Sequence, residues 1–181
     1  MALIAWQIVG CILLADFLTG LGHWFEDTYS VPTWPILGRI IAEPNINHHL
    51  QPNEMAPTFW ERNKWQLIPA WVFLIGLATI SLLTWEIALI INALALGNET
   101  HSWCHKKVSN PLITLLQDMG ISINPRQHHK HHKHPYEKTF CTLTNFVNPV
   151  VDRLQLWRFL EWIIAKLGIP PKRGTEQRNF V

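Results

Sequence analysis

The chain has 181 residues, of which 48% are hydrophobic and ten are tryptophan, and its formal net charge is +2. This length fits a single domain, and the small net charge gives no reason to expect a nucleic-acid partner. The three cysteines, Cys11, Cys104 and Cys141, form no CxxC pair, which argues against a disulfide framework and a thiolate metal site, so reduced cysteines are expected.

The first element is a mostly apolar run over residues 3–21, interrupted by Gln7 and Asp16. It is long enough to cross a hydrocarbon core of about 30 Å, and it has no basic leader or cleavage site, so we predict a transmembrane helix rather than a secretory signal. If the helix continues, Asp16, His23 and Asp27 share one face, because their spacings are seven and four. A carboxylate within a span is costly, so Asp16 is either an orienting partner of a metal-bound imidazole or a polar interfacial residue without a role.

The next segment, residues 28–64, is proline-rich and amphipathic. His48 and His49 are adjacent there, between Pro44 and Pro52. Such a pair on a loop is a weak signal alone and gains weight only from the other histidines.

Residues 67–96 carry a single formal charge, Glu86. One helix of this length would extend about 45 Å, too long for one upright crossing, so we predict a hairpin of two helices, residues 65–83 and 85–102, although no glycine or proline marks a turn near Thr84. Three crossings place all the histidine-bearing segments on one side of the membrane. All fifteen lysines and arginines fall on that side, after residue 38, which the positive-inside rule assigns to the cytoplasm.

Seven of the ten histidines lie between residues 101 and 134. His101 and His105 are four apart, the spacing that places two imidazoles on one helix face. Imidazole suits zinc, copper, iron and nickel, and a site without cysteine argues against structural zinc.

A second short helix is predicted to start at Asn124-Pro125 and to end at Pro135. Its histidines at positions 128, 131 and 132 would share a face. The alternatives are an expression tag, a solvated basic run or a metal-buffering tail; a tag would be terminal and uninterrupted, and this tract is neither.

Two further helices are predicted after His105. Residues 111–123 form a short apolar helix at the interface, with Gln117 and Asp118 near the site. Residues 149–167 form an amphipathic helix, either a packed cap or an in-plane membrane helix, and its aromatic residues favour the second.

The histidine clusters together supply eight candidate ligands on one membrane face. They are His23, His48, His49, His101, His105, His128, His131 and His132. Eight ligands divide into about four for each of two ions, with positions left open for oxygen chemistry. Such a site in a small apolar helix bundle resembles the membrane desaturases and hydroxylases, in which two irons activate O2.

A closer resemblance is carried by five ordered motifs: ADFLTGLGHWFEDTY, NHHLQP, NETHSWCH, LLQDMGI and NPRQHHKHHKHPYEKTFC. Over roughly residues 15–174 the chain is similar to the plasmanylethanolamine desaturases and the plastid phosphatidylglycerol palmitate desaturases, the Kua or lipid desaturase family. The resemblance implies an all-α integral membrane domain with two iron ions held by the eight histidines named above. His129 and His134 fall outside the family pattern.

The same resemblance implies further site residues and partners. Asp16 and Asp27 match carboxylates that flank the first histidine in the family, and both are expected to orient a metal-bound imidazole rather than to bind the metal. Asn98 and Asp118 are weaker candidate catalytic residues. The implied reaction is the O2-dependent desaturation of a phospholipid chain, with electrons from an external cytochrome b5-like or ferredoxin-like donor, because no haem or flavin motif is present.

Several alternatives stay open. The substrate is expected to be a plasmanyl lipid converted to its vinyl ether, or else an acyl chain of phosphatidylglycerol. A lipid hydroxylase on the same scaffold and a non-catalytic membrane metal-binding or signalling protein are the other hypotheses. The expected location is a bacterial inner membrane or the endoplasmic reticulum, with the histidine-rich face in the cytoplasm.

Overall fold

The structure, a computed structural model, describes residues 2–106, 108 and 110–172, and within these ranges it is all-helical, as predicted. The elements in chain order are α1 (Ala2–Tyr29), the π-helix η1 (Gly38–Ala42), α2 (Glu43–Leu50), α3 (Phe59–Thr79), α4 (Trp85–Ala95), α5 (Gly97–His105), α6 (Pro111–Asp118), α7 (Pro125–His128), α8 (Val147–Arg153) and α9 (Leu156–Lys166).

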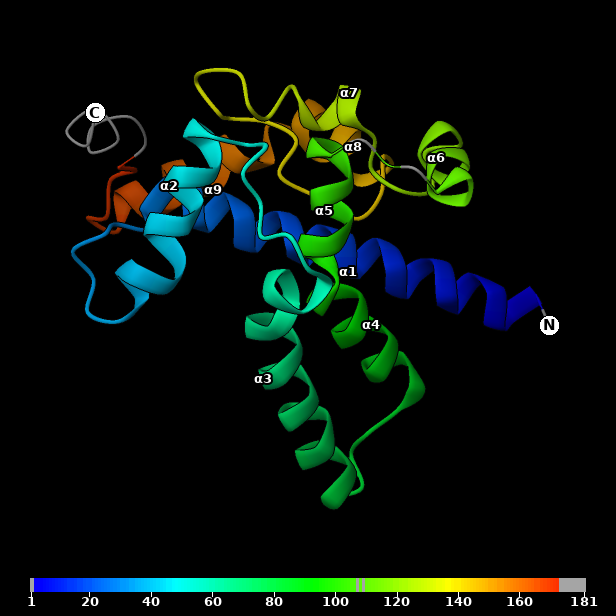
Figure 1. Cartoon of the computed structure of the whole chain (residues 1–181). Coiled ribbons are helices and arrows are strands. Elements are labelled where there is room, and N and C mark those ends of the chain that lie inside the picture. Colours follow the sequence, from blue (N-terminus) through cyan, green and yellow to red (C-terminus); the bar gives the residue numbers. More distant parts are fainter. Residues whose placement is uncertain (1, 107, 109, 173–181) are drawn as a thin grey trace.

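Helix α1 is the longest element and crosses the base of the hairpin formed by α3 and α4 (Figure 1). It continues eight residues beyond the predicted span at residues 3–21, and this continuation carries His23 and Asp27 on its buried side. Among the described residues, α1 is the helix whose length and mean hydropathy would allow it to cross a membrane. It packs against α4, α2 and α8.

The chain reverses between α3 and α4, so the two helices run antiparallel (Figure 1). Capping explains how this turn forms without glycine or proline: Ser81 adopts a positive φ of 58°, and the Thr84 side chain accepts a hydrogen bond from the Ile87 amide. The predicted second helix of the hairpin is interrupted at Leu96, which separates α4 from α5. Gly97 lies at this break because a Cβ there would come within 3.3 Å of side-chain atoms of Thr19 and Thr142.

The predicted amphipathic helix at residues 149–167 is two helices, α8 and α9, because Gln155 adopts a left-handed conformation with φ 52°. Its inward face is a packed cap on α1: the Trp157 ring is 2% exposed and stacks on Phe17 with a centroid distance of 6.2 Å. Its outward face leaves Phe159 and Trp162 exposed.

A buried loop, residues 139–144, packs beside α1. At the closest approach, a Cβ added to Gly20 would lie 2.5 Å from Cys141 Sγ and 3.1 Å from the Cys141 backbone nitrogen. A larger side chain at position 20 has no room, because the backbone of the loop cannot move away without losing its own hydrogen bonds to α1.

Replacing Gly20 with alanine is therefore expected to lower the free energy of unfolding by about 1–3 kcal/mol, the usual cost of overpacking. Gly22→Ala is the matched control, since nothing lies within 4 Å of a Cβ at that position; it should be neutral or raise stability by up to about 1 kcal/mol. Denaturant or thermal unfolding of the detergent-solubilised variants would measure both. Equal stabilities would contradict the close packing of α1 on this loop.

Candidate metal centre

The structure brings the eight predicted histidines together at one end of the bundle, although they come from four separate segments. They form two groups in which the potential ligand atoms all lie within 4.8 Å of one another. The first group is His48, His101, His105, His128 and His132, and the second is His23, Asp27, His49 and His131. The two groups are neighbours: the ring centroids of His49 and His132 are 5.0 Å apart.

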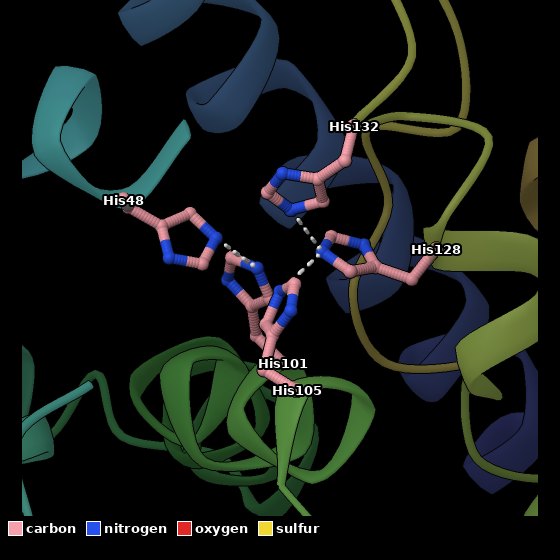
Figure 2. A group of neighbouring side chains, drawn as sticks. All are labelled: His48, His101, His105, His128 and His132. Atoms are coloured by element: carbon pink, nitrogen blue, oxygen red, sulfur yellow. Dashed lines mark hydrogen bonds between the residues drawn. The ribbon is translucent and has the colours of Figure 1, made fainter. Parts of the chain in front are cut away.

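The first group consists of imidazoles alone, and their rings point toward one another (Figure 2). Nε2 of His128 lies 2.9 Å from Nε2 of His105 and 3.0 Å from Nε2 of His132. Nε2 of His48 lies 3.0 Å from Nε2 of His101. Two nitrogens bound at right angles to one ion, each at about 2.1 Å, are about 3.0 Å apart, so these spacings fit shared coordination of a metal.

The second group includes the carboxylate of Asp27, which was predicted to orient a histidine ligand rather than to be a ligand itself. Asp27 Oδ1 lies 3.0 Å from His49 Nε2, and Asp27 Oδ2 lies 3.2 Å from His131 Nε2. Within the described residues, Asp27 Oδ2 and His131 Nε2 are buried without a hydrogen bond of proper geometry. Buried polar atoms without partners are costly, and a cation between them would satisfy both. Asp27 is therefore a candidate ligand as well as a candidate orienting group.

Backbone carbonyls fix the ring orientation of two histidines in the second group. His23 Nδ1 lies 3.1 Å from the Phe140 carbonyl oxygen, and His131 Nδ1 lies 3.0 Å from the Lys138 carbonyl oxygen. A carbonyl oxygen accepts a hydrogen bond only from a nitrogen that carries a proton. Each ring therefore carries its proton on Nδ1 and turns the unprotonated Nε2 toward the candidate metal centre.

Two imidazoles of the first group, those of His48 and His105, are held in the neutral form that metal binding requires. Burial, together with the neighbouring histidines, lowers the pKa of His48 to about 2 and the pKa of His105 to about 4. The imidazoles of His48 and His105 are therefore neutral at neutral pH, so neither has to lose a proton before it binds a cation.

The last histidine tract is organised by a turn rather than by the longer helix that was predicted. Asn124 does cap a helix at Pro125, as predicted, but α7 ends at His128. The turn that follows sends His131 to the second group and His132 to the first.

The other two histidines of the tract face outward. His129 is exposed and its Nδ1 lies 2.8 Å from the Pro125 carbonyl oxygen, while His134 is exposed beside Tyr136. Neither belongs to the two groups.

A polar tie between α3 and α5 was missed by the sequence interpretation. The Arg62 guanidinium donates to both oxygens of Glu99 at 2.9 Å, and Asn63 and Trp103 also donate to this carboxylate. This bidentate interaction fixes the first turn of α5 relative to α3, and it thereby fixes the positions of His101 and His105 on α5. The signal lies in residues too far apart in sequence to be paired without the fold.

Two weaker candidates from the sequence are not brought to the metal centre. The Asn98 amide donates to the Arg62 carbonyl oxygen, so it supports the α3–α5 contact. Asp118 is exposed at the end of α6, while its neighbour Gln117 donates to the carbonyl oxygens of Trp103 and Ile123.

Asp16 also differs from expectation, because its carboxylate faces the buried loop rather than a histidine. Oδ1 accepts a hydrogen bond from the Leu143 amide at 2.8 Å, and Oδ2 accepts one from the Thr144 hydroxyl. These bonds satisfy the buried carboxylate and fasten the loop that also carries the Phe140 carbonyl, the partner of His23. Asp16 can act on the centre only through this loop.

Asp16→Ala is expected to destabilise the fold by about 1–3 kcal/mol, because it leaves a buried amide and hydroxyl without an acceptor. Metal content per folded chain should stay close to that of the unchanged protein. Unfolding curves together with metal analysis of the folded fraction would test this. A variant of normal stability that has lost metal would instead restore the role of Asp16 as an orienting partner of a histidine.

Comparison with known proteins gives a consistent result. A family model described as the lipid desaturase domain matches residues 12–173. A probable fatty acid desaturase of Acanthamoeba polyphaga mimivirus is 33% identical over 187 residues, which cover 97% of this chain and 88% of that protein. Plasmanylethanolamine desaturase 1 of Mus musculus is 32% identical over 186 residues, covering 94% and 68% of the two chains.

A plastid relative is more distant. The chloroplastic fatty acid desaturase 4 of Arabidopsis thaliana is 28% identical over 181 residues, covering 92% of this chain and 54% of that protein. No solved structure matches the chain. The resemblance derived from the ordered motifs is thereby confirmed.

Proposed function

This chain belongs to the lipid desaturase family and is an oxidoreductase, and on that premise we propose that it introduces a double bond into a phospholipid chain by an O2-dependent reaction at a di-iron centre. The observation that carries the proposal is the pair of adjacent ligand groups, which contain eight histidines and Asp27. The favoured substrate is a plasmanyl lipid converted to its vinyl ether, in keeping with the mouse relative.

The donor set fits iron. It contains imidazole nitrogens and one carboxylate, without a thiolate, and this combination suits non-haem iron. We assign the first ion to His48, His101, His105, His128 and His132, and the second to His23, Asp27, His49 and His131. Iron, when bound, would supply the activation of O2 that an unactivated C–H bond requires.

The residues of the chain contribute orientation and a dry environment. The carbonyls of Phe140 and Lys138 hold His23 and His131 with Nε2 inward. The Asn45 amide donates to Asp27 Oδ1 at 2.6 Å, which directs the other carboxylate oxygen toward His131. Burial of His23, His101, His128 and His131 excludes water from the centre and so protects a reactive oxidant from side reactions.

The overall reaction balances as follows: two hydrogens leave adjacent carbons, and one O2 with two electrons and two protons becomes two molecules of water. The electrons would come from an external one-electron carrier of the cytochrome b5-like or ferredoxin-like type.

We place residues 3–21 of α1 and the α3–α4 hairpin in the membrane, and the histidine-rich face, which includes the last turns of α1, in the cytoplasm; the membrane would be a bacterial inner membrane or the endoplasmic reticulum. Apolar side chains exposed along the hairpin support this placement; they are Ile68, Trp71, Val72, Phe73, Ile75, Ile80, Leu82 and Leu83. A further support is that all fifteen basic residues follow residue 38 and none lies between Gln66 and His105.

The proposal predicts a specific product. Cells supplied with an alkyl ether phospholipid and expressing this chain should accumulate a lipid that is lighter by two hydrogens and whose vinyl ether is cleaved by acid, as read by mass spectrometry. A product heavier by one oxygen would identify a hydroxylase, and an acid-stable product with a new acyl double bond would identify an acyl desaturase. Tightly bound zinc without any O2 consumption would favour a non-catalytic metal-binding protein.

A further inference from the structure

A cavity of about 480 Å³ lies outside the metal centre, between residues 133–138 and the junction of α8 with α9. Its lining includes three basic side chains, those of Lys133, Lys138 and Arg158, each on an exposed residue. The mechanism proposed above makes no use of this cavity.

The two acidic residues in the lining each have a partner within this chain. Glu137 is paired with Arg158, and Asp152 accepts hydrogen bonds from the Thr139 amide and from Trp157 Nε1. The amino groups of Lys133 and Lys138 therefore give the mouth a positive balance, which is complementary to a surface rich in carboxylates.

The inner wall of the cavity leads to the metal centre through two aromatic rings. Trp157 lines the cavity, and its ring centroid is 5.2 Å from that of Phe140. The Phe140 ring is in turn 5.1 Å from the ring of His131 and 6.0 Å from that of His23. Both aromatic side chains are at most 2% exposed, so they form a closed partition.

This partition distinguishes two possible uses of the cavity. A lipid chain cannot pass from the cavity to the metal centre without displacing Phe140 and Trp157, both of which are packed in the core. An electron can pass, because it tunnels through short van der Waals contacts and needs no opening. A basic mouth over an aromatic partition is thus suited to a redox partner rather than to the substrate.

We propose that this cavity is the docking site of an acidic one-electron carrier protein, whose surface carboxylates reach Lys133 and Lys138 and whose electron reaches the centre by way of Trp157, Phe140 and His131. The inference rests on the proposed desaturase function, which requires an external donor. Each docking oxidises the carrier by one electron and reduces the metal centre by one, so two dockings supply the two electrons consumed with each O2.

The first test is binding without turnover. The metal-free protein in nanodiscs of uncharged lipid would be titrated with the soluble haem domain of cytochrome b5, an acidic one-electron carrier, at low and high salt. Lys133→Glu/Lys138→Glu is expected to weaken binding about tenfold or more at low salt, and the difference should shrink as salt screens the charges. Arg39→Glu/Lys172→Glu, with the same charge change outside the cavity, should bind within about twofold of the unchanged protein.

The second test separates docking from catalysis. With the iron-loaded protein, reduction by the cytochrome b5 haem domain should slow in the single variant Lys133→Glu, which leaves Lys138 in place to orient His131, about in proportion to the affinity that this variant has lost. Single-turnover product formation by Lys133→Glu after reduction by dithionite should be unchanged. Unchanged carrier affinity in the double variant would overturn the proposal. So would normal carrier affinity with a raised KM for the lipid, which would make the cavity a headgroup site.

Failure of the proposed function would look different. No product with dithionite in the unchanged protein would remove the desaturase assignment, while the titration of the metal-free protein would still report whether the cavity binds an acidic carrier.

Discussion

Replacing His131 with alanine is expected to abolish desaturation and to lower the metal content of the folded chain. His131 is fully buried, its Nδ1 is held by the Lys138 carbonyl oxygen, and its Nε2 faces Asp27 at 3.2 Å. Loss of an orienting partner of a metal ligand alone costs about 10- to 100-fold in affinity or activity, so loss of the imidazole itself should cost at least about 100-fold. Metal per folded chain and desaturated product per folded chain are the two measurements.

His129→Ala is the matched control for this variant. It removes an imidazole from the same tract, yet this ring is exposed and contacts the Pro125 carbonyl oxygen rather than the centre. Most of the activity should remain, and His134→Ala should behave in the same way. Equal losses in all three variants would mean that the tract binds metal as an undifferentiated cluster, and the two-group assignment would then fail.

The second large effect is expected for Asp27→Asn. This substitution keeps the size of the side chain but removes the negative charge that lies 3.0 Å from His49 Nε2 and 3.2 Å from His131 Nε2. A neutral amide is a much weaker ligand than a carboxylate, so the second ion should be lost first and metal content should fall from about two ions toward one per chain. Activity should fall by at least about 100-fold, because O2 activation would need both ions.

Glu26→Gln is the control for Asp27→Asn, because it neutralises the preceding carboxylate on α1, which belongs to neither ligand group. It should retain both ions. Full metal occupancy in Asp27→Asn together with slow turnover would show that Asp27 orients the histidines without binding the metal, as the sequence interpretation expected. Normal occupancy and normal turnover would remove Asp27 from the site.

The helical class, the candidate ligand histidines and the family could be derived from local features of the sequence. A long apolar run favours helix whatever surrounds it, and the four-residue spacing of His101 and His105 places both rings on one face of α5, where the structure has them. The cap at Asn124 was likewise predictable, because its side chain needs only the amide of Gln127 three residues later.

Helix lengths were less predictable, since contacts between distant segments decide where helices stop. The predicted helix at residues 85–102 is broken at Leu96, where α1 and the loop at residue 142 approach Gly97. The predicted helix at residues 149–167 is broken at Gln155, which lets Trp157 turn onto α1.

The sequence by itself determined that two carboxylates and a histidine lie on one face of α1, but only the tertiary structure decided what each of them contacts. Asp16 and Asp27 lie on the same helix as His23 at helical spacing, and spacing cannot distinguish them. The loop at residues 143–144 packs on Asp16 and saturates it with hydrogen bonds, whereas α2 and the turn after α7 bring His49 and His131 to Asp27. The same reason separates His131 from His132: adjacent side chains of a turn point in different directions, and the neighbours that receive them come from distant parts of the chain.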